Sequence, residues 1–236
     1  KKCSHLQTPP GWLVYSTDHT RVYRVDGMIQ KMYCQTLSLF AKLFLDSKSV
    51  NFSTEGFDFF VVCQESERFS GSWQPMGFFS KEKLSWDDNN LACILVFPPF
   101  QRKGLGRFLI EYSYFVSRSE SKIGSPEKPL SKFGKVSYYS YWCATVARFL
   151  LDENKKKKIS IDDITNATYI RQDDVMIALE QMEALERVVT KIGKRYRISK
   201  PQVHAWVIRT KTKLEPVIDY KCCYVLRYPE ILLCPN

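Results

Sequence analysis

The chain has 236 residues, 44% hydrophobic and 14% aromatic, enough to bury the core of one large domain or of a domain with a small appendage. A formal charge of +10 favours an acidic partner such as DNA, a nucleosome surface or a polyphosphate cofactor. No stretch reaches the roughly 18 uninterrupted apolar residues of a membrane span and no signal peptide opens the sequence, so we expect a soluble protein without membrane contact.

The cysteine pattern and the basic runs bear on the compartment. Eight cysteines are scattered through the chain without the even spacing of a secreted disulfide framework, which predicts reduced, intracellular thiols. Residues 155–158 form a run of lysines that is short for a nuclear targeting signal and is better explained as a solvated loop between domains.

The first third of the chain predicts strands and one helix. Alternating residues at 21–25 and 30–34 flank an Asp-Gly turn signal and predict an antiparallel hairpin. Residues 36–45 carry apolar side chains at helical spacing. Aromatic and β-branched runs at 57–64 and 76–79 predict two further paired strands, leading to a central strand near Ala92.

A strand, a break, a glycine loop and a helix follow one another across residues 91–121. An apolar run ends at Pro98-Pro99, and the helix begins near Gly104. Such a turn leaves several backbone N–H groups pointing one way, and its glycines let a pyrophosphate approach closely. The loop is neither a Walker loop nor Gly-x-Gly-x-x-Gly, and taken alone it is equally explained as a basic loop that caps a surface helix.

The second half of the chain predicts mainly helices. Two prolines exclude a regular helix across residues 124–129, which places Glu127 on a shaped loop, and residues 137–151 resume a helical pattern. After an N-cap at Ser160, a second helix over 173–186 and a strand over 195–198 give the order of a winged-helix-like unit. That second helix is acidic, so packing against the core is favoured over direct DNA binding, which stays open.

The run from 76 to 142 resembles the catalytic core of MYST-type histone acetyltransferases nearly end to end, and residues 33–35 and 41–46 match upstream. Within it, the sequence Gln101-Arg102-Lys103-Gly104-Leu105-Gly106 is similar to the Gln/Arg-x-x-Gly-x-Gly/Ala signature that holds the pyrophosphate of acetyl-coenzyme A. The amino-acid sequence at residues 89–93 and 97–99 looks most like that of the fungal "something about silencing" branch.

The resemblance implies an α+β fold with a GNAT-like acetyltransferase core, in which helices flank a mixed or antiparallel sheet, plus a C-terminal winged-helix-like region. The expected domains are 1–20, a remnant of an N-terminal zinc-finger region and linker, 21–152, the acetyl-CoA-binding catalytic core, and 159–236, the helical region. Cys3 matches the fourth zinc ligand of the family's finger, whose other ligands are absent from this sequence. An ordinary surface cysteine is the alternative.

The resemblance also assigns the site. Glu127 aligns with the glutamate of the family's Ser-Pro-Glu-Lys-Pro-Leu-Ser motif, which makes it the expected general base for a lysine ammonium of pKa about 10.4. Cys93 should lie beside the thioester, either as an acyl-accepting nucleophile or as an inert thiol in an apolar setting. Lys48 aligns with the lysine that the family acetylates on itself. The residues expected to bind the cofactor are Ile94, Leu95, Val96, Gln101, Arg102, Lys103, Gly104, Leu105, Gly106, Arg107, Ser131 and Ser140.

The implied function is a nuclear histone lysine acetyltransferase that uses acetyl-CoA. Its favoured substrate is the histone H4 tail, and it would act as a subunit of a larger complex. The rival from another class is a catalytically silent chromatin-binding scaffold with the same fold. Cys93, Glu127 and the glycine loop argue against it, because a scaffold needs none of them together.

Overall fold

The computed structural model describes residues 8–44, 53–66, 71–152, 159–190 and 193–224. The chain divides into two compact units, each of which is described by itself. The first comprises Lys1–Ser85, Leu91–Leu109 and Asp219–Asn236, and the second comprises Trp86–Asn90 and Ile110–Ile218. Within the described ranges, no helix is both long enough and apolar enough to cross a membrane.

The first unit is built on a five-stranded antiparallel sheet in the order β1-β2-β3-β4-β6. The paired strands predicted from the aromatic runs are confirmed as β3 and β4, where the stacked rings of Phe60 and Phe79 lie 4.6 Å apart. The elements of this unit are β1 (Trp12–Ser16), β2 (Thr20–Asp26), α1 (Lys31–Lys42), β3 (Phe57–Glu65), β4 (Trp73–Glu82), β6 (Cys93–Val96), and the short 3₁₀ helices η2 (Pro98–Phe100) and η3 (Tyr220–Cys222).

The strand before the glycine loop lies at one end of the sheet order, so its predicted central position is wrong. The apolar run that predicted one strand is divided. Its first part, β5 (Asn89–Leu91), pairs with β7 (Ser125–Pro126) in a separate two-stranded sheet. Only β6 joins the large sheet, where it pairs with β4.

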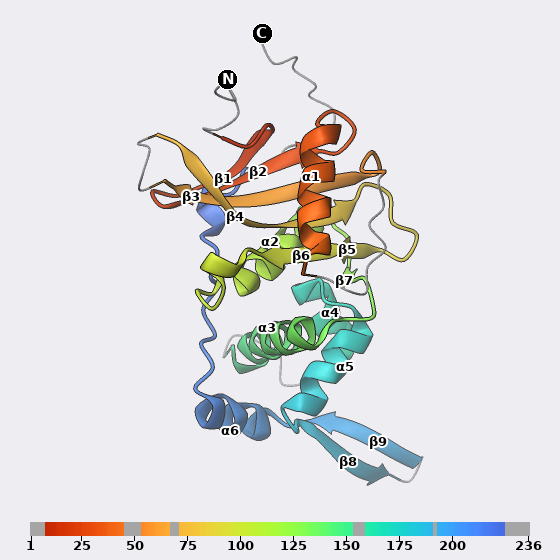
Figure 1. Cartoon of the computed structure of the whole chain (residues 1–236). Helices are drawn as coiled ribbons and strands as arrows, with labels where there is room; N and C mark the ends of the chain where they lie inside the picture. The colour runs from red at the N-terminus through yellow and green to blue at the C-terminus, as the bar shows by residue number, and fades with distance from the viewer. Residues whose placement is uncertain (1–7, 45–52, 67–70, 153–158, 191–192, 225–236) are drawn as a thin grey trace, which may run out of the picture. The chain divides into compact units, whose positions relative to one another are not determined.

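Helix α1 occupies the place of the second strand predicted at residues 30–34, and that prediction is wrong. The carboxylate of Asp26 accepts hydrogen bonds from the backbone N–H groups of Met28 and Ile29, at 2.8 and 3.1 Å, so the chain turns into a helix directly after β2. Helix α1 crosses the strands of the sheet (Figure 1). The side chains of α1 that join the core of the sheet are Cys34, Leu37 and Ala41.

The outer edge of β1, a strand that the sequence analysis missed, is covered by the end of the described chain. The N–H of Tyr224 donates to the carbonyl oxygen of Val14 at 2.9 Å, and Cys223 forms an isolated bridge with Tyr15. The ring of Tyr15 also packs edge-on against Phe108, with centroids 5.4 Å apart, which attaches the start of the next helix to this strand.

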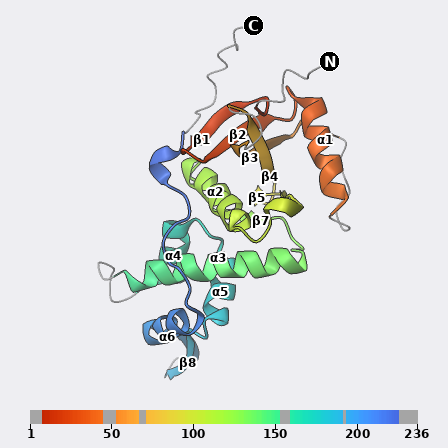
Figure 2. The ribbon, with the colours of Figure 1, turned by 60° about the vertical axis from the view of Figure 1, so that its left-hand side comes forward.

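The described part of the second unit is organised around α3, which buries nine residues and against which α4, α5 and α6 pack (Figure 2). The indole N–H of Trp142 donates to the hydroxyl of Tyr114 at 2.8 Å, which joins α3 to α2. The elements of this unit are the later part of α2 (Leu105–Ser119), α3 (Lys132–Leu151), α4 (Ile161–Thr168), α5 (Gln172–Gln181), β8 (Leu185–Thr190), β9 (Gly193–Ile198) and α6 (Lys200–Thr210).

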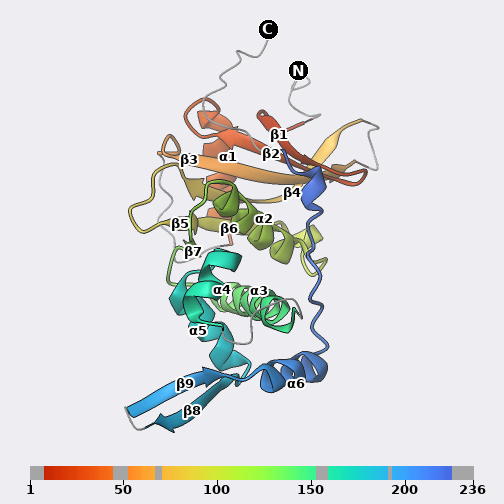
Figure 3. The same cartoon turned by 180° about the vertical axis from the view of Figure 1, so that it is seen from behind.

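The predicted cap of α4 is confirmed, because Ser160 and Asp163 form a reciprocal capping box. The helix predicted over 173–186 is confirmed as far as Gln181, where α5 ends, and is wrong beyond it. Glu183 adopts a left-handed φ of 55°, and the chain then enters the β8–β9 hairpin, seen from behind in Figure 3. Helix α6 was not predicted. The α+β class, an antiparallel sheet with flanking helices, is confirmed.

Candidate functional site

The glycine loop connects the end of β6 to the start of α2 within the first unit. After η2 turns the chain, Arg102 and Gly104 adopt left-handed φ angles of 60° and 83°. The first helical bond of α2 follows at once, from the N–H of Phe108 to the carbonyl of Gly104 at 3.1 Å. Two left-handed residues with one residue between them form a tight, exposed turn, and Gly104 adopts this conformation at no steric cost.

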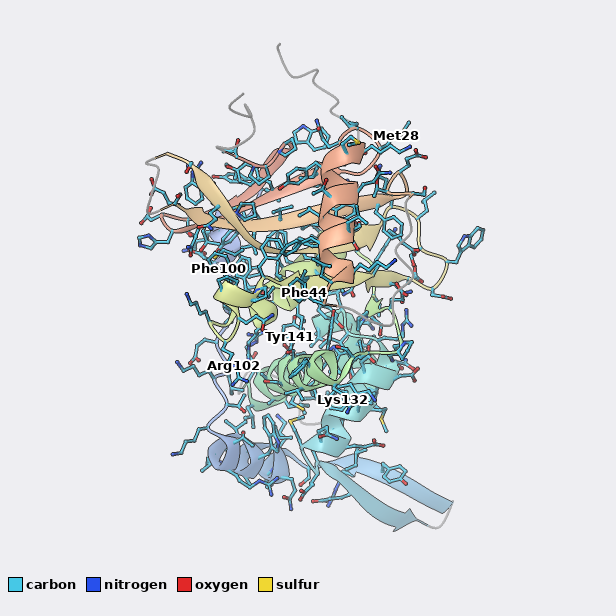
Figure 4. The ribbon with its side chains drawn as sticks, viewed as in Figure 1. Met28, Phe44, Phe100, Arg102, Lys132 and Tyr141 are labelled. Carbon is cyan, nitrogen blue, oxygen red and sulfur yellow. The ribbon has the colours of Figure 1, made fainter. Side chains whose placement is uncertain are left out.

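Side chains brace this loop against the strand that precedes it. The amide Nε2 of Gln101 donates to the carbonyl oxygen of Val96 at 2.9 Å, and Lys103 Nζ lies 5.8 Å from the ring centroid of Phe100. Figure 4 labels Phe100 and Arg102 on this segment. Gln101 was predicted to bind the pyrophosphate, and the observed bond gives its side chain the further task of holding the loop to β6.

The loop fits the pyrophosphate of acetyl-CoA by two observations. A Cβ added at Gly104 or Gly106 would meet no atom within 4 Å, so space is open in front of both residues. The first turn of α2 contains no acidic residue, and the first N–H groups of a helix have no partner inside it, so this end favours an anion. Arg102 and Lys103 are exposed there and add positive charge.

The residues predicted for the acyl arm of the cofactor lie on β6. This strand ends the sheet order, so its outer edge can pair with extended amide groups. Leu95 points into the core with 6% exposure, whereas Ile94 and Val96 are half-buried. Leu105 and Arg107, at the start of α2, are half-buried as well.

Cys93 is the first residue of β6, as the sequence predicted for the strand before the loop. Its Cα pairs in register with Ser80 of β4, and its half-buried side chain packs against the core of the sheet. Its thiol is not part of a disulfide. By contrast, the thiol of Cys143 is buried, and desolvation raises its pKa to about 12.

Glu127 lies in the second unit, on the loop between β7 and α3, and its side chain is exposed. The chain just before it is fixed, because the N–H of Gly124 donates to the carbonyl of Tyr169 at 3.1 Å and the carbonyl of Gly124 accepts from Arg171 N–H at 3.3 Å. Ser125 and Pro126 are buried, and Glu127 is the first exposed residue after them.

The residues on either side of Glu127 bind one buried carboxylate. Ser125 Oγ donates to Asp174 Oδ2 at 2.6 Å, and Lys128 Nζ donates to Asp174 Oδ1 at 2.8 Å. The sequence analysis missed Asp174 as part of the site and read it only as one charge of an acidic helix. No local signal could have found it, because it is 49 residues from Ser125 and 46 from Lys128.

Ser131 and Ser140 are exposed residues of the same unit, at the N-cap and within the first half of α3. The hydroxyl of Ser131 accepts a hydrogen bond from Gly134 N–H at 3.0 Å, so this serine caps α3. Figure 4 labels Lys132 and Tyr141 on this helix. The predicted cofactor residues therefore fall into two sets, with residues 94–107 in the first unit and these two serines in the second.

Cys3 and Lys48 lie outside the described residues. Among those that are described, no group of three or more His, Cys, Asp or Glu side chains is arranged to hold a metal ion.

Comparison with known proteins gives a consistent result. The family model described as the MOZ/SAS family matches residues 8–223 of the chain. Over 213 residues, the chain is 37% identical to histone acetyltransferase SAS2 of Saccharomyces cerevisiae, covering 89% of the chain and 60% of that protein. It is 43% identical to the histone acetyltransferase Tip60 homolog of Caenorhabditis elegans over 186 residues, or 78% of the chain and 40% of that protein.

A plant relative, histone acetyltransferase of the MYST family 1 from Arabidopsis thaliana, is 43% identical over 188 residues, covering 79% of the chain. The chain thus spans between 40% and 60% of the length of these three relatives.

Proposed function

The chain belongs to the MOZ/SAS family, and we propose on that basis that it is a histone lysine acetyltransferase that uses acetyl-CoA. One observation carries the proposal. The glycine loop keeps open space at Gly104 and Gly106, at a helix end without acidic residues, in a chain whose relatives are named histone acetyltransferases.

In this proposal, residues 101–107 bind the pyrophosphate and the backbone of β6 pairs with the amides of the pantetheine arm. Bound acetyl-CoA supplies an acetyl group activated as a thioester. Glu127 accepts a proton from the ammonium of the histone lysine, because only the free amine is a nucleophile. Cys93 lies next to the thioester, as the acyl acceptor or as a neighbour of a direct attack. Ser131 and Ser140 complete the cofactor site.

We further propose the finer assignments of the resemblance. Residues 21–152 form a GNAT-like catalytic core, and 159–236 form a winged-helix-like region, supported by the order α4, α5, β8, β9, α6. Residues 1–20 belong to a zinc-finger region and linker, with Cys3 as a zinc ligand. The likeness to a relative named histone acetyltransferase SAS2 supports histones as the substrate class. We propose, as the resemblance implies, a nuclear protein that acts on the histone H4 tail within a complex. Lys48 is proposed to be acetylated by the enzyme itself, and peptide mass analysis of the active protein should find that acetyl group.

The alternative is a silent chromatin-binding scaffold. It is tested by incubating the protein with core histones and isotopically labelled acetyl-CoA, followed by mass spectrometry. We expect label on lysines of the H4 tail with the wild type and none with Gly106→Val. Binding of acetyl-CoA without transfer to any histone would contradict the proposal and favour the scaffold.

A further inference from the structure

The loop that carries Glu127 is short and exposed, and backbone hydrogen bonds hold it on its N-terminal side. Its backbone is tied to the segment before α5 through Gly124, which also forms a parallel bridge with Ile170. On the two sides of Glu127, Ser125 and Lys128 are held by side-chain contacts.

Asp174 supplies such contacts to both sides of Glu127. Its two carboxylate oxygens are divided between the loop's positions, with Oδ2 taking the Ser125 hydroxyl at 2.6 Å and Oδ1 taking the Lys128 ammonium at 2.8 Å. Ser125 precedes Glu127 by two residues and Lys128 follows it by one. A single carboxylate thus holds the loop two residues before and one residue after the proposed base.

Burial and the position in helix α5 both keep the charged side chain of Asp174 in place. The Asp174 side chain has 0% exposure, whereas that of Lys128 has 44%. The buried carboxylate therefore determines where the lysine ammonium lies. Asp174 lies in the first turn of α5, where the helix dipole stabilises a negative charge. A fully buried carboxylate is retained only if it is paired and hydrogen-bonded, and both of its oxygens meet that condition here.

The pairing also decides where a positive charge lies. Lys128 is the sequence neighbour of Glu127. The bond to Asp174 directs the Lys128 ammonium toward the buried carboxylate in the first turn of α5.

We propose that Asp174 is a positioning residue for acetyl transfer, which acts through Ser125 and Lys128 to fix the orientation of Glu127. The inference rests on the proposed function, because it assigns Asp174 a role in the reaction of Glu127. It does not depend on how Glu127 meets the cofactor.

The first test is a double-mutant cycle measured as histone acetylation. Asp174→Asn keeps the side chain's size but cannot pair with Lys128, and misplacement of the base should lower kcat about 10–100-fold while KM for acetyl-CoA changes less than about threefold. In a Glu127→Gln background the same substitution should have little further effect, because the residue through which it acts is gone. Asp173→Asn, which removes a charge from the exposed neighbour on the same helix turn, is the matched control and should leave kcat unchanged.

A purely structural role predicts a different outcome, in which the effects of Asp174→Asn and Glu127→Gln multiply. That result would overturn the inference while leaving the proposed function intact. An inactive wild type with bound acetyl-CoA would overturn the proposed function and this inference with it.

Should Asp174→Asn fail to fold, Lys128→Gln provides the second variant, because its side chain is partly exposed. Hydrogen exchange should then show faster exchange at the amides of Glu127 and Lys128, by at least about tenfold, with the buried centre of α3 unchanged. Unaltered exchange at these two amides, or a Lys128→Gln effect on kcat that persists in full without Glu127, would refute the positioning role.

Discussion

The side-chain Nε2 of Gln101 donates a hydrogen bond to the backbone carbonyl of Val96 at 2.9 Å. Val96 is the last residue of β6, and Gln101 is the first residue after η2. The bond therefore closes the turn between strand and helix across five positions of sequence. The shape of the glycine loop is built into the protein in this way, and binding does not have to create it.

Gly106→Val tests the loop as a cofactor site. Gly106 has no left-handed φ, and a Cβ there meets no atom within 4 Å, so the free protein should keep its melting temperature. The added side chain would occupy the space of the pyrophosphate, and affinity for acetyl-CoA should fall at least about tenfold by calorimetry. Gly56→Val is the matched control, since its Cβ also meets open space. Equal affinities for the two variants would rule out this location.

Glu127→Gln tests the base. The substitution keeps the size of the side chain but cannot accept the proton, so kcat should fall by roughly 10²–10⁴ at pH 7 while acetyl-CoA still binds. The defect should shrink as pH approaches the substrate lysine's pKa of about 10.4, because solvent then provides the free amine. A wild-type rate across pH 6–9 would mean that another group is the base.

The thiols should differ in reactivity with iodoacetamide. The thiolate is the reactive form, and because burial raises the pKa of Cys143 to about 12, only about 10⁻⁴ of it is ionised at pH 8. The half-buried Cys93 should be alkylated well before it, and acetyl-CoA should protect Cys93. Peptide mapping decides this, and labelling of Cys93 that is indifferent to saturating acetyl-CoA would place the thioester elsewhere.

Asp26 should make stability depend on pH. Burial would raise the pKa of this carboxyl, but hydrogen bonds from Lys83, Ile29 and Met28 outweigh it and hold the pKa below its usual value. A lowered folded pKa contributes stability above the unfolded value of about 3.9, and this is lost as pH falls through the folded value. Asp26→Asn should cost about 1–2 kcal/mol at pH 7, and the difference from wild type should vanish in acid.

The control for that measurement is Asp18→Asn, in the exposed turn between β1 and β2. Its unfolding curve should follow the wild type at every pH. A pH-independent difference for Asp26→Asn would show that its carboxylate is not stabilised by the observed bonds.

Sequence reasoning succeeded where the signal was local. The aromatic runs of β3 and β4, the glycine loop and the Ser160 cap each follow from neighbouring residues. It failed at residues 30–34, where alternating side chains fit either a strand or the first turn of a helix. Asp26 accepts hydrogen bonds from the backbone N–H groups of Met28 and Ile29, in the turn that leads into α1. The contacts of Asp174 could not be predicted from the sequence, because they join segments far apart in the chain.

The hydrogen bonds between Asp174 and the loop of Glu127 predict how a shortened gene product would behave. A transcript that stops near residue 152 would still encode Cys93, the glycine loop and Glu127, but not the aspartate to which the loop is bound. Such a fragment that kept its fold would take up acetyl-CoA while turning over poorly, and so would compete with the intact enzyme for a shared metabolite. On the positioning role proposed for Asp174, full activity depends on the last third of the sequence, although the groups proposed to perform the reaction are encoded earlier.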